Sequence, residues 1–342
     1  MKKPILSICI PTYNRGEFAY AAAKHLLDNW GGDEIEVVIS DNNSQDNTQQ
    51  LIKSIKDCRL KYYRNDENLG AAFNTHLTFL RATGEYAYLT SDEDDLDVNE
   101  IPYLLNFFKK NPEVSVFVGG GDLTYTQKRF PDAVYTNAFD SLKAIAFKTR
   151  YMTGIIMNQK LYAEEMSHIS FEESAEVWDA YSFMYAMARL CCRGHVVTSS
   201  HLLFSQPRLT MTDVSNNARK DGIYYYEPEG RINQMYTWSK AICGLDISDY
   251  EKSYMLVKII FDTVELATRL FNPGYVEEVR KTVPSSDFAI YQSRILSLNK
   301  KELTEKILHK GDALFVEFFG KTIDQFEDSG IQEYYNERIK EL

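Results

Sequence analysis

Short apolar runs of strand type alternate with helical segments through the first third of the chain. Ile5–Ile10, Ile35–Ile39 and Val114–Val118 are mostly apolar and rich in β-branched residues, as buried parallel strands are. Between them lie segments with apolar residues at helical spacing, such as residues 17–30 and 98–110. This alternation predicts an α/β fold with a doubly wound, mostly parallel sheet.

Polar clusters follow three of the predicted strands directly, at residues 12–15, 41–46 and 92–95. The carboxyl ends of parallel strands meet at one edge of a sheet, and ligands of such sheets bind there. We therefore expect the three clusters to form one binding rim.

The third cluster consists of four consecutive acids, Asp92 to Asp95. Four like charges this close repel one another by a few kcal/mol at surface-like dielectric, which suggests a cation that offsets them. Asp92 and Asp94 are two residues apart, so in an extended chain they would point the same way and could share one hard divalent ion. The alternative is a solvated acidic turn before a helix that begins near Val98.

Composition excludes several classes of protein. The net charge of −11 lacks the basic footprint of a nucleic-acid binder and gives no attraction to an anionic membrane. Five cysteines without metal spacing indicate reduced thiols, and no stretch approaches the roughly 20 apolar residues of a transmembrane segment. The glycines at 119–121 match no phosphate-loop motif, and no GxSxG hydrolase motif occurs. We expect a cytoplasmic protein.

The second half of the chain changes character. Residues 210–229 are polar and turn-rich, and the chain beyond Arg231 is almost wholly helical in pattern. We therefore expect a catalytic-type α/β domain over residues 1–218 and a mainly helical domain over residues 231–342. Met255–Phe271 has enough apolar residues to bury one face, in a core, at a homodimer seam or, less favoured, on a membrane.

The rim motifs carry a family resemblance. PTYNR, SDNNSQDNT, NDENLGAAFN and YLTSDEDD occur in an order and spacing that resemble the N-terminal half of GT-A glycosyltransferases of family 2. The resemblance implies a GT-A fold, a nucleotide-sugar donor (a UDP-sugar), Mn²⁺ or Mg²⁺, and inverting transfer to an acceptor hydroxyl. It also implies a glycan or lipid-linked glycan acceptor in bacterial surface polysaccharide synthesis, at the inner face of the membrane.

By this resemblance, Pro11, Thr12 and Tyr13 form a wall of the nucleotide pocket, and Asp41 meets the base. A carboxylate only accepts hydrogen bonds, so it suits the N3–H donor of uracil. The alternative for Asp41 is an Asx-type turn. Arg15 is expected near phosphate, with a surface position at a helix start as the alternative.

The third motif supplies further expected donor contacts. Asn68 and Gly70 match the N-x-G turn of the family, and Asn74 is expected to face the donor, with helix packing as the alternative. Asp46 is expected to cap the helix that begins near Thr48.

The acidic cluster matches the D-x-D-D element of the family. The resemblance makes Asp94 the metal ligand through the donor diphosphate, puts Asp92 on ribose or metal, and includes Glu93 among the donor contacts. Mg²⁺ and Mn²⁺ take oxygen ligands and keep positions open for phosphate.

The catalytic base is expected in the stretch Glu176-Val177-Trp178-Asp179, which resembles the E-D-W/Y-D motif of inverting members. Val177 occupies the position of the usual base, so Glu176 or Asp179 is predicted to deprotonate the acceptor. Alternatively, these acids only cap the next helix. A protein whose base is lost would be a non-catalytic nucleotide-sugar binder, which is the competing function.

Overall fold

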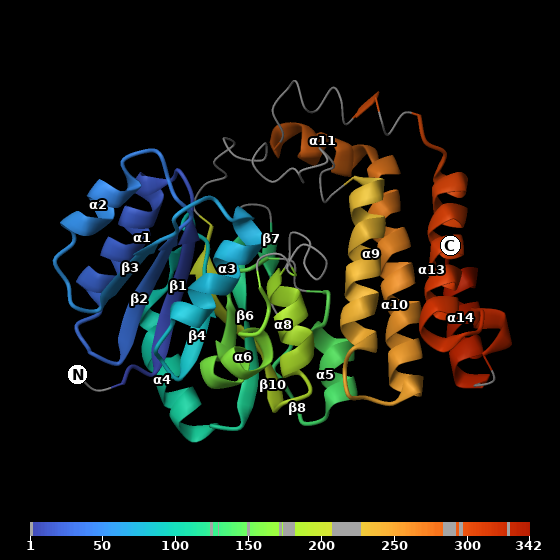
Figure 1. Cartoon of the computed structure of the whole chain (residues 1–342), viewed down its shortest axis with the longest axis horizontal. Coiled ribbons are helices and arrows are strands. Elements are labelled where there is room, and N and C mark those ends of the chain that lie inside the picture. The colour runs from blue at the N-terminus through green and yellow to red at the C-terminus, as the bar shows by residue number, and fades with distance from the viewer. Residues whose placement is uncertain are drawn as a thin grey trace. The chain divides into compact units, whose positions relative to one another are not determined.

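The computed structural model describes residues 3–123, 126–128, 130–148, 151–170, 173, 182–206, 227–282, 292–293, 297–326 and 329–342. The chain divides into two compact units, residues 1–209 and residues 210–342. Figure 1 shows the strands of the first unit and the helices of the second. No helix in the described ranges combines the length and the apolar character needed to cross a bilayer.

The described part of the first unit is built on one ten-stranded sheet, in which eight strands follow the order β3-β2-β1-β4-β9-β6-β10-β5, β7 pairs with β6 and β8 pairs with β10. Its parallel half comprises β1 (Leu6–Thr12), β2 (Ile35–Asp41), β3 (Leu60–Arg64) and β4 (Tyr86–Leu89). The other strands are β5 (Asp95–Leu96), β6 (Val114–Leu123), β7 (Thr126–Lys128), β8 (Ala133–Tyr135), β9 (Ile155–Asn158) and β10 (His195–Ser205). Strands β6 and β10 are parallel to each other, and β9 is antiparallel to both β4 and β6.

Helices cover both faces of this sheet. On one face, α1 (Gly16–Asn29) and α4 (Ile101–Lys110) share an apolar core with Ile8 and Ile10 of β1. On the other, α3 (Gly70–Arg81), α6 (Gln159–Met166) and α8 (Ser182–Leu190) contact one another, and Cys9 faces α3. Figure 1 shows these three helices in front of the sheet. The shorter helices are α2 (Thr48–Ser54), α5 (Ala138–Ile145) and η1 (Val98–Glu100).

The three glycines at 119–121 lie inside β6, in keeping with their lack of a phosphate-loop pattern. A Cβ at Gly121 would lie 2.1 Å from the ring of Phe204, and one at Gly119 would lie 2.3 Å from Leu203. These glycines therefore leave room for side chains of β10, the neighbouring strand.

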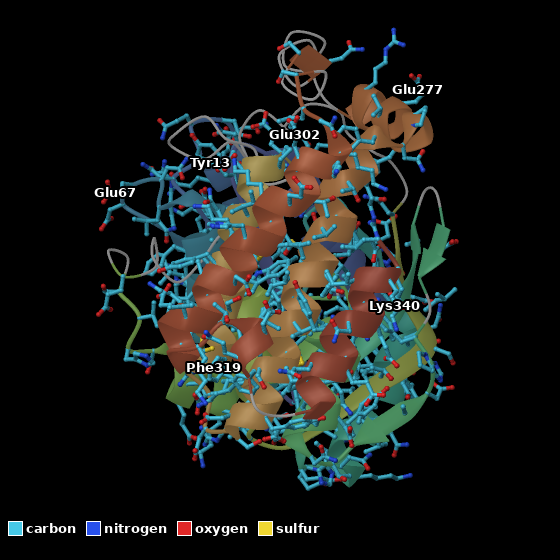
Figure 2. All side chains as sticks on the ribbon, turned by 90° about the vertical axis from the view of Figure 1, so that its right-hand side faces the viewer. Tyr13, Glu67, Glu277, Glu302, Phe319 and Lys340 are labelled. Atoms are coloured by element: carbon cyan, nitrogen blue, oxygen red, sulfur yellow. The ribbon has the colours of Figure 1, made fainter. Side chains whose placement is uncertain are left out.

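The second unit is helical. Its described elements are α9 (Pro228–Cys243), α10 (Asp249–Thr268), η3 (Arg269–Phe271), α11 (Pro273–Thr282), α13 (Lys300–Phe319), η4 (Ile323–Gln325) and α14 (Ser329–Lys340). A capping box between Ser248 and Glu251 begins α10, which contacts α9, α13 and α14. Figure 2 shows Glu302 near the beginning of α13 and Phe319 at its end. The apolar residues of α10 are buried, as the core alternative for residues 255–271 requires.

Candidate functional site

The acidic cluster lies beyond the carboxyl end of β4, on the rim that the polar motifs predict. The segment Ser91–Asp94, here called the acidic turn, is not extended, because residues 92 and 93 form a turn and the Asp94 N–H points to the Ser91 carbonyl at 3.4 Å. The expectation of an extended chain with two parallel carboxylates was therefore wrong. In this turn, Asp92 and Asp94 have different hydrogen-bond partners.

Asp92 faces the end of β1 and the start of α1. The Thr12 hydroxyl donates a hydrogen bond to Asp92 Oδ2 at 2.7 Å, and Arg15 Nε lies 3.3 Å from Asp92 Oδ1. Arg15 also pairs with Glu93 through Nη2 at 2.5 Å. Two of the acids thus share one guanidinium, and Arg15 is an ion-pair partner of the acidic turn. Its contact with phosphate stays a prediction.

Asp94 is buried, with 1% of its surface exposed, and its neighbours are hydroxyls. The Tyr151 hydroxyl donates to Asp94 Oδ1 at 2.6 Å, and the Thr153 hydroxyl donates to Oδ2. Among the residues that the structure describes, no cationic side chain pairs with Asp94. Its negative charge is therefore solvated by dipoles alone.

The pKa values of the two aspartates follow from these surroundings. Burial raises the pKa of Asp92 to about 6, against the opposing effects of Arg15 and Thr12. Burial likewise raises the pKa of Asp94 to about 7, and the charges of Glu93 and Asp92 add to the rise. Such a site favours an additional cation, since a positive charge stabilises the ionised carboxylates.

Asp95 faces a different surface. It is exposed, pairs with Ser205 across β5 and β10, and lines a cavity of 520 Å³ together with His25, Asp97 and Asp122. The four acids are therefore not one cation site: Asp95 is exposed, Asp92 and Glu93 share Arg15, and Asp94 accepts hydrogen bonds from two hydroxyls.

The donor set of the acidic turn fits a divalent ion that a substrate helps to hold. No group of three His, Cys, Asp or Glu side chains suited to a metal exists in the described ranges. The turn carries three carboxylates: Glu93 is partly exposed and pairs with Arg15, and Asp92 and Asp94 are buried. Mg²⁺ is commonly bound by one or two carboxylates plus substrate phosphates, so two carboxylates match that mode of binding.

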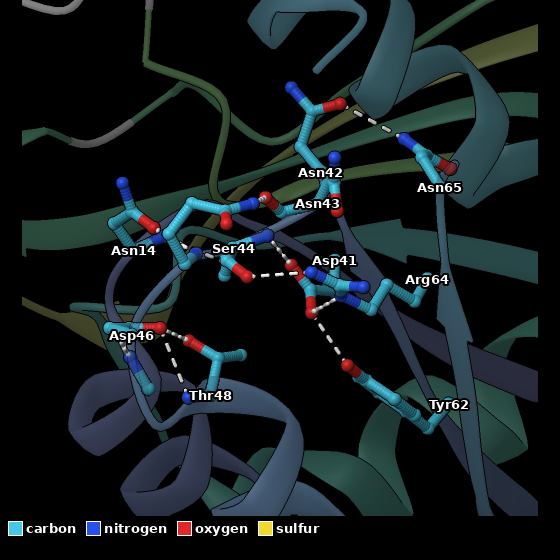
Figure 3. A network of polar contacts seen from close by, with 12 residues as sticks. Asn14, Asp41, Asn42, Asn43, Ser44, Asp46, Thr48, Tyr62, Arg64 and Asn65 are labelled. Atoms are coloured by element: carbon cyan, nitrogen blue, oxygen red, sulfur yellow. Dashed lines mark hydrogen bonds and ion pairs between the residues drawn. The ribbon is translucent and has the colours of Figure 1, made fainter. Parts of the chain in front are cut away.

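Asp41, at the end of β2, is fully buried and forms a turn with the residues after it (Figure 3). The Ser44 N–H donates to Asp41 Oδ1 at 2.8 Å, the Tyr62 hydroxyl donates to Oδ2 at 2.5 Å, and Arg64 lies 3.5 Å from Oδ2. These are the contacts of the Asx-turn interpretation. Recognition of a base by Asp41 stays a prediction.

Asp46 ties the first two helices together (Figure 3). Its carboxylate accepts hydrogen bonds from the Thr48 N–H at 3.0 Å, at the start of α2, and from the Gly16 N–H at 3.1 Å, at the start of α1. The N-cap residue of α2 is Asn47 and not Asp46 as predicted, but Asp46 precedes it and accepts the N–H of Thr48, the first residue of the helix. A Cβ at Gly16 would lie 2.7 Å from the Thr48 Cα, so this contact requires glycine.

Asn74 lies in a buried polar network under the rim. Its Oδ1 accepts hydrogen bonds from the Ser40 hydroxyl at 2.7 Å and from Asn65 Nδ2 at 3.0 Å, and its Nδ2 donates to the Ser40 carbonyl at 2.9 Å. The Arg81 guanidinium donates to both Ser40 and Asn65. This is the environment that the helix-packing alternative for Asn74 requires.

The same network holds the N-x-G turn. Asn42 Nδ2 donates to Asn68 Oδ1 at 2.7 Å, and Asn42 Oδ1 accepts from Asn65 and from the Leu69 N–H. Asn68 Oδ1 also accepts from the Gly70 N–H, and Gly70 has φ of +77°, a conformation that favours glycine. We call Ser40, Asn42, Asn65, Asn68, Asn74 and Arg81 the amide network.

Comparison with known proteins identifies the first unit. Residues 7–163 match the model described as glycosyl transferase family 2. Over these residues, which are just under half of the chain, the sequence is similar to that of a family 2 glycosyltransferase domain. The predicted resemblance is thereby confirmed.

Two curated relatives are similar over part of this glycosyltransferase domain. GalNAc(5)-diNAcBac-PP-undecaprenol β-1,3-glucosyltransferase of Campylobacter jejuni is 31% identical over 96 residues, which is 27% of this chain and 31% of the relative. UDP-Glc:α-D-GlcNAc-diphosphoundecaprenol β-1,3-glucosyltransferase WfaP of Escherichia coli is 34% identical over 90 residues, which is 26% and 36%. The chain spans less than half the length of these relatives.

A solved structure agrees in fold over nearly the whole chain. The crystal structure of S. aureus TarS 1-349 in complex with UDP-GlcNAc is 16% identical, with a TM-score of 0.59, and the match covers 97% of this chain and 91% of that one. The predicted GT-A-type sheet with a helical C-terminal region is confirmed.

The remaining predicted site residues divide into two groups. Pro11 and Tyr13 are partly buried at the end of β1, on the same rim as Thr12, and their contact with a nucleotide stays a prediction. Glu176 and Asp179 lie outside the described residues, so the prediction of the catalytic base also stands as it was.

The sequence analysis missed the two hydroxyls that bind Asp94. Tyr151 and Thr153 lie 57 and 59 residues after Asp94, in a stretch with no motif of its own. Their side chains have signals for neither metal nor phosphate, so only the three-dimensional structure brings them to the acidic turn.

Proposed function

We propose that this protein transfers a sugar from a UDP-sugar to a hydroxyl of a glycan or lipid-linked glycan, with inversion at the sugar and with Mn²⁺ or Mg²⁺. The observation that carries the proposal is Asp94: a buried carboxylate with no cationic partner among the described residues, on the rim of a family 2 glycosyltransferase domain. A buried charge left without a counter-ion is costly, so a ligand that supplies positive charge accounts for it.

The metal proposal rests on the contrast between the two buried aspartates. Arg15 already lies beside Asp92, whereas within the described ranges Asp94 accepts hydrogen bonds only from the neutral hydroxyls of Tyr151 and Thr153. Asp94 would therefore hold the ion, with Asp92 oriented by Thr12 as a second ligand or a ribose contact. When bound there, the ion supplies Lewis acidity for the departing nucleoside diphosphate.

The donor proposal rests on the position of the rim residues. Strand β1 ends with Pro11 and Thr12, and Tyr13 follows it. The strand pairs in parallel with β2, and Thr12 lies opposite Asp41. A nucleoside that enters between them would bring its diphosphate toward the acidic turn, which Thr12 contacts. UDP is the proposed nucleotide because names of similar proteins include UDP-Glc and UDP-GlcNAc.

The acceptor proposal rests on the relatives. Both curated glucosyltransferases above are named for undecaprenol-linked diphosphate substrates, so a lipid-linked glycan at the inner face of the membrane is proposed here. Glu176 or Asp179 would remove the proton of the acceptor hydroxyl as general base. The helical unit would contribute acceptor binding, dimerisation or membrane contact.

The test combines binding with turnover. The full chain is melted with UDP and UDP-sugars in the presence of Mn²⁺, Mg²⁺ or EDTA, and UDP release is measured with undecaprenyl-diphosphate-linked saccharides. A ligand at a hundred times its Kd stabilises the fold by about 2.7 kcal/mol, which a melting experiment detects. We expect a metal-dependent shift with UDP-sugar and release of UDP upon addition of acceptor.

The same experiment separates the competing functions. Glu176→Gln and Asp179→Asn should retain the metal-dependent shift, and the variant of the true base should lose release. A shift without release for any acceptor tested would favour a non-catalytic nucleotide-sugar binder. No shift with any nucleotide would contradict both functions.

A further inference from the structure

The Asp94 carboxylate is held on both oxygens by one short segment of chain. Tyr151 donates to Oδ1 at 2.6 Å and Thr153 donates to Oδ2. Each carboxylate oxygen has two lone-pair directions, so one direction on each oxygen is used and one is left. Two donors on two oxygens fix the carboxylate plane, whereas one donor would let it rotate.

The direction of the Thr153 hydrogen bond is determined by a second contact. Thr153 Oγ1 accepts the Ser91 N–H at 2.9 Å, so its lone pairs serve the turn and its single proton is available for Asp94. Ser91 and Asp94 are the two ends of the acidic turn. Thr153 therefore binds both ends of the turn at once.

Tyr151 is held from the other side by the sheet. Its ring is parallel to that of Phe204, with 5.5 Å between the centroids. Phe204 is buried in β10, next to the space that Gly121 leaves open, and it pairs with Leu96 of β5. The position of the Tyr151 hydroxyl thus depends on β6 and β10, which lie far from Asp94 in sequence, and on β5, which directly follows Asp94.

We propose that Tyr151 and Thr153 are positioning residues, which orient the Asp94 carboxylate so that its remaining lone pairs point at the divalent ion of the donor complex. This inference rests on the proposed function. It goes beyond that function because the two residues do not themselves contact donor or metal; they act through Asp94. Partners of this kind typically change metal affinity by about 10–100-fold when they are removed.

The test is a titration of the full chain with Mn²⁺ in the presence of saturating UDP. Electron paramagnetic resonance measures the concentration of free Mn²⁺ at each step, which gives the Kd for Mn²⁺. We expect Tyr151→Phe and Thr153→Val each to weaken Mn²⁺ affinity by about 10–100-fold. Thr153→Ser keeps the hydroxyl and should bind Mn²⁺ like the wild type. A protein in which Thr153→Ser and Thr153→Val bind alike, or in which Tyr151→Phe matches the wild type, would overturn the proposal.

A matched control exists within the same unit. Tyr162 is also buried, and its hydroxyl lies 2.9 Å from His76 Nδ1, a partner outside the acidic turn. Tyr162→Phe removes the same atom as Tyr151→Phe, so it should cost stability and leave Mn²⁺ affinity unchanged. Equal losses in both variants would mean a general packing effect and would overturn the positioning role.

Failure of the proposed function looks different from failure of this inference. If the wild type takes up no Mn²⁺ with UDP, the proposed function fails and the positioning role fails with it. If the wild type binds Mn²⁺ and the variants bind it equally well, only the positioning role fails.

Discussion

The amide network and the acidic turn lie on the same rim, but their buried polar groups differ in the partners that they have inside the fold. In the amide network, Asn74 uses both ends of its side chain on partners inside the fold, and all the groups are neutral except Arg81. In the acidic turn, Asp92 and Asp94 are buried carboxyl groups whose pKa values are raised by that burial. In the first region the polar groups are partners of one another, whereas in the second Asp94 has no cationic partner among the residues that the structure describes.

The difference separates scaffold from site. A buried network in which each group has a partner rigidifies the fold and gains nothing from a ligand. A buried carboxylate with only hydroxyl donors is stabilised by any cation that arrives. We infer that the amide network holds the N-x-G turn in shape, and that the acidic turn is where binding energy is gained.

The largest expected effect comes from Asp94→Asn. Removal of this charge should lower transferase activity by at least about 100-fold, since charge stabilisation at the leaving group is lost. The same variant in EDTA should melt at or above the wild-type temperature, because a neutral amide replaces a buried charge. Activity assays and thermal melts of one preparation measure both.

The matched control for Asp94→Asn is Asp95→Asn, in the neighbouring acid that is exposed. It should leave activity and melting temperature near wild type. A variant at Asp94 that loses stability together with activity would place this carboxylate in the scaffold and break the comparison.

Asn74→Ala should show the reverse behaviour. It removes the acceptor of the Ser40 hydroxyl and of one Asn65 N–H, together with the donor to the Ser40 carbonyl, which should lower the free energy of unfolding by about 3 kcal/mol. The KM for the donor should stay close to wild type in the folded fraction. Urea unfolding measures the stability, and initial rates at varied donor concentration measure the KM. A raised KM for the donor at unchanged stability would mean that Asn74 contacts the donor.

His76 makes the scaffold side sensitive to acid. It is buried on α3 beside Tyr162, and burial lowers its pKa from 6.5 to about 4. The folded protein keeps it neutral while the unfolded chain takes a proton, so stability is lost as pH falls from 6.5 through 4. The loss is about 2 kcal/mol at pH 5. His76→Gln should lack this loss in urea titrations at pH 8 and 5; an equal pH slope in both proteins would contradict it.

The smallest effect is expected for Glu93→Gln. Glu93 is partly exposed, with 21% of its side chain accessible, and its Arg15 partner also lies beside Asp92. The variant should lose less than about 1 kcal/mol of stability and far less activity than Asp94→Asn. A larger activity loss here than at Asp94 would mean that the number of acids matters more than their burial.

Local patterns predicted the fold well and the site in part. The apolar runs became β1, β2 and β6, and Asp46 contacts α2 at Thr48 as expected. The sequence predicted the position of the acidic turn on the rim correctly but its conformation wrongly. The two-residue spacing of Asp92 and Asp94 is the same in an extended chain and in a turn in which the Asp94 N–H points to the Ser91 carbonyl. No sequence motif indicated Tyr151. Its hydroxyl donates to Asp94 and its ring stacks on Phe204, and both contacts exist only in the folded chain.

The sequence by itself determined the alternation of strands and helices in the first motifs, the rim on which they meet and the family that they resemble, because periodicity and short motifs are local properties. Only the tertiary structure decided which acid stands without a counter-ion. Burial and partners set the free energy of a charge, and both depend on residues from β1, α1 and the segment before β9 that are distant in sequence. Four consecutive acids with similar intrinsic chemistry thus acquired different environments: Asp95 is exposed, Asp92 and Glu93 share Arg15, and Asp94 is buried among hydroxyls.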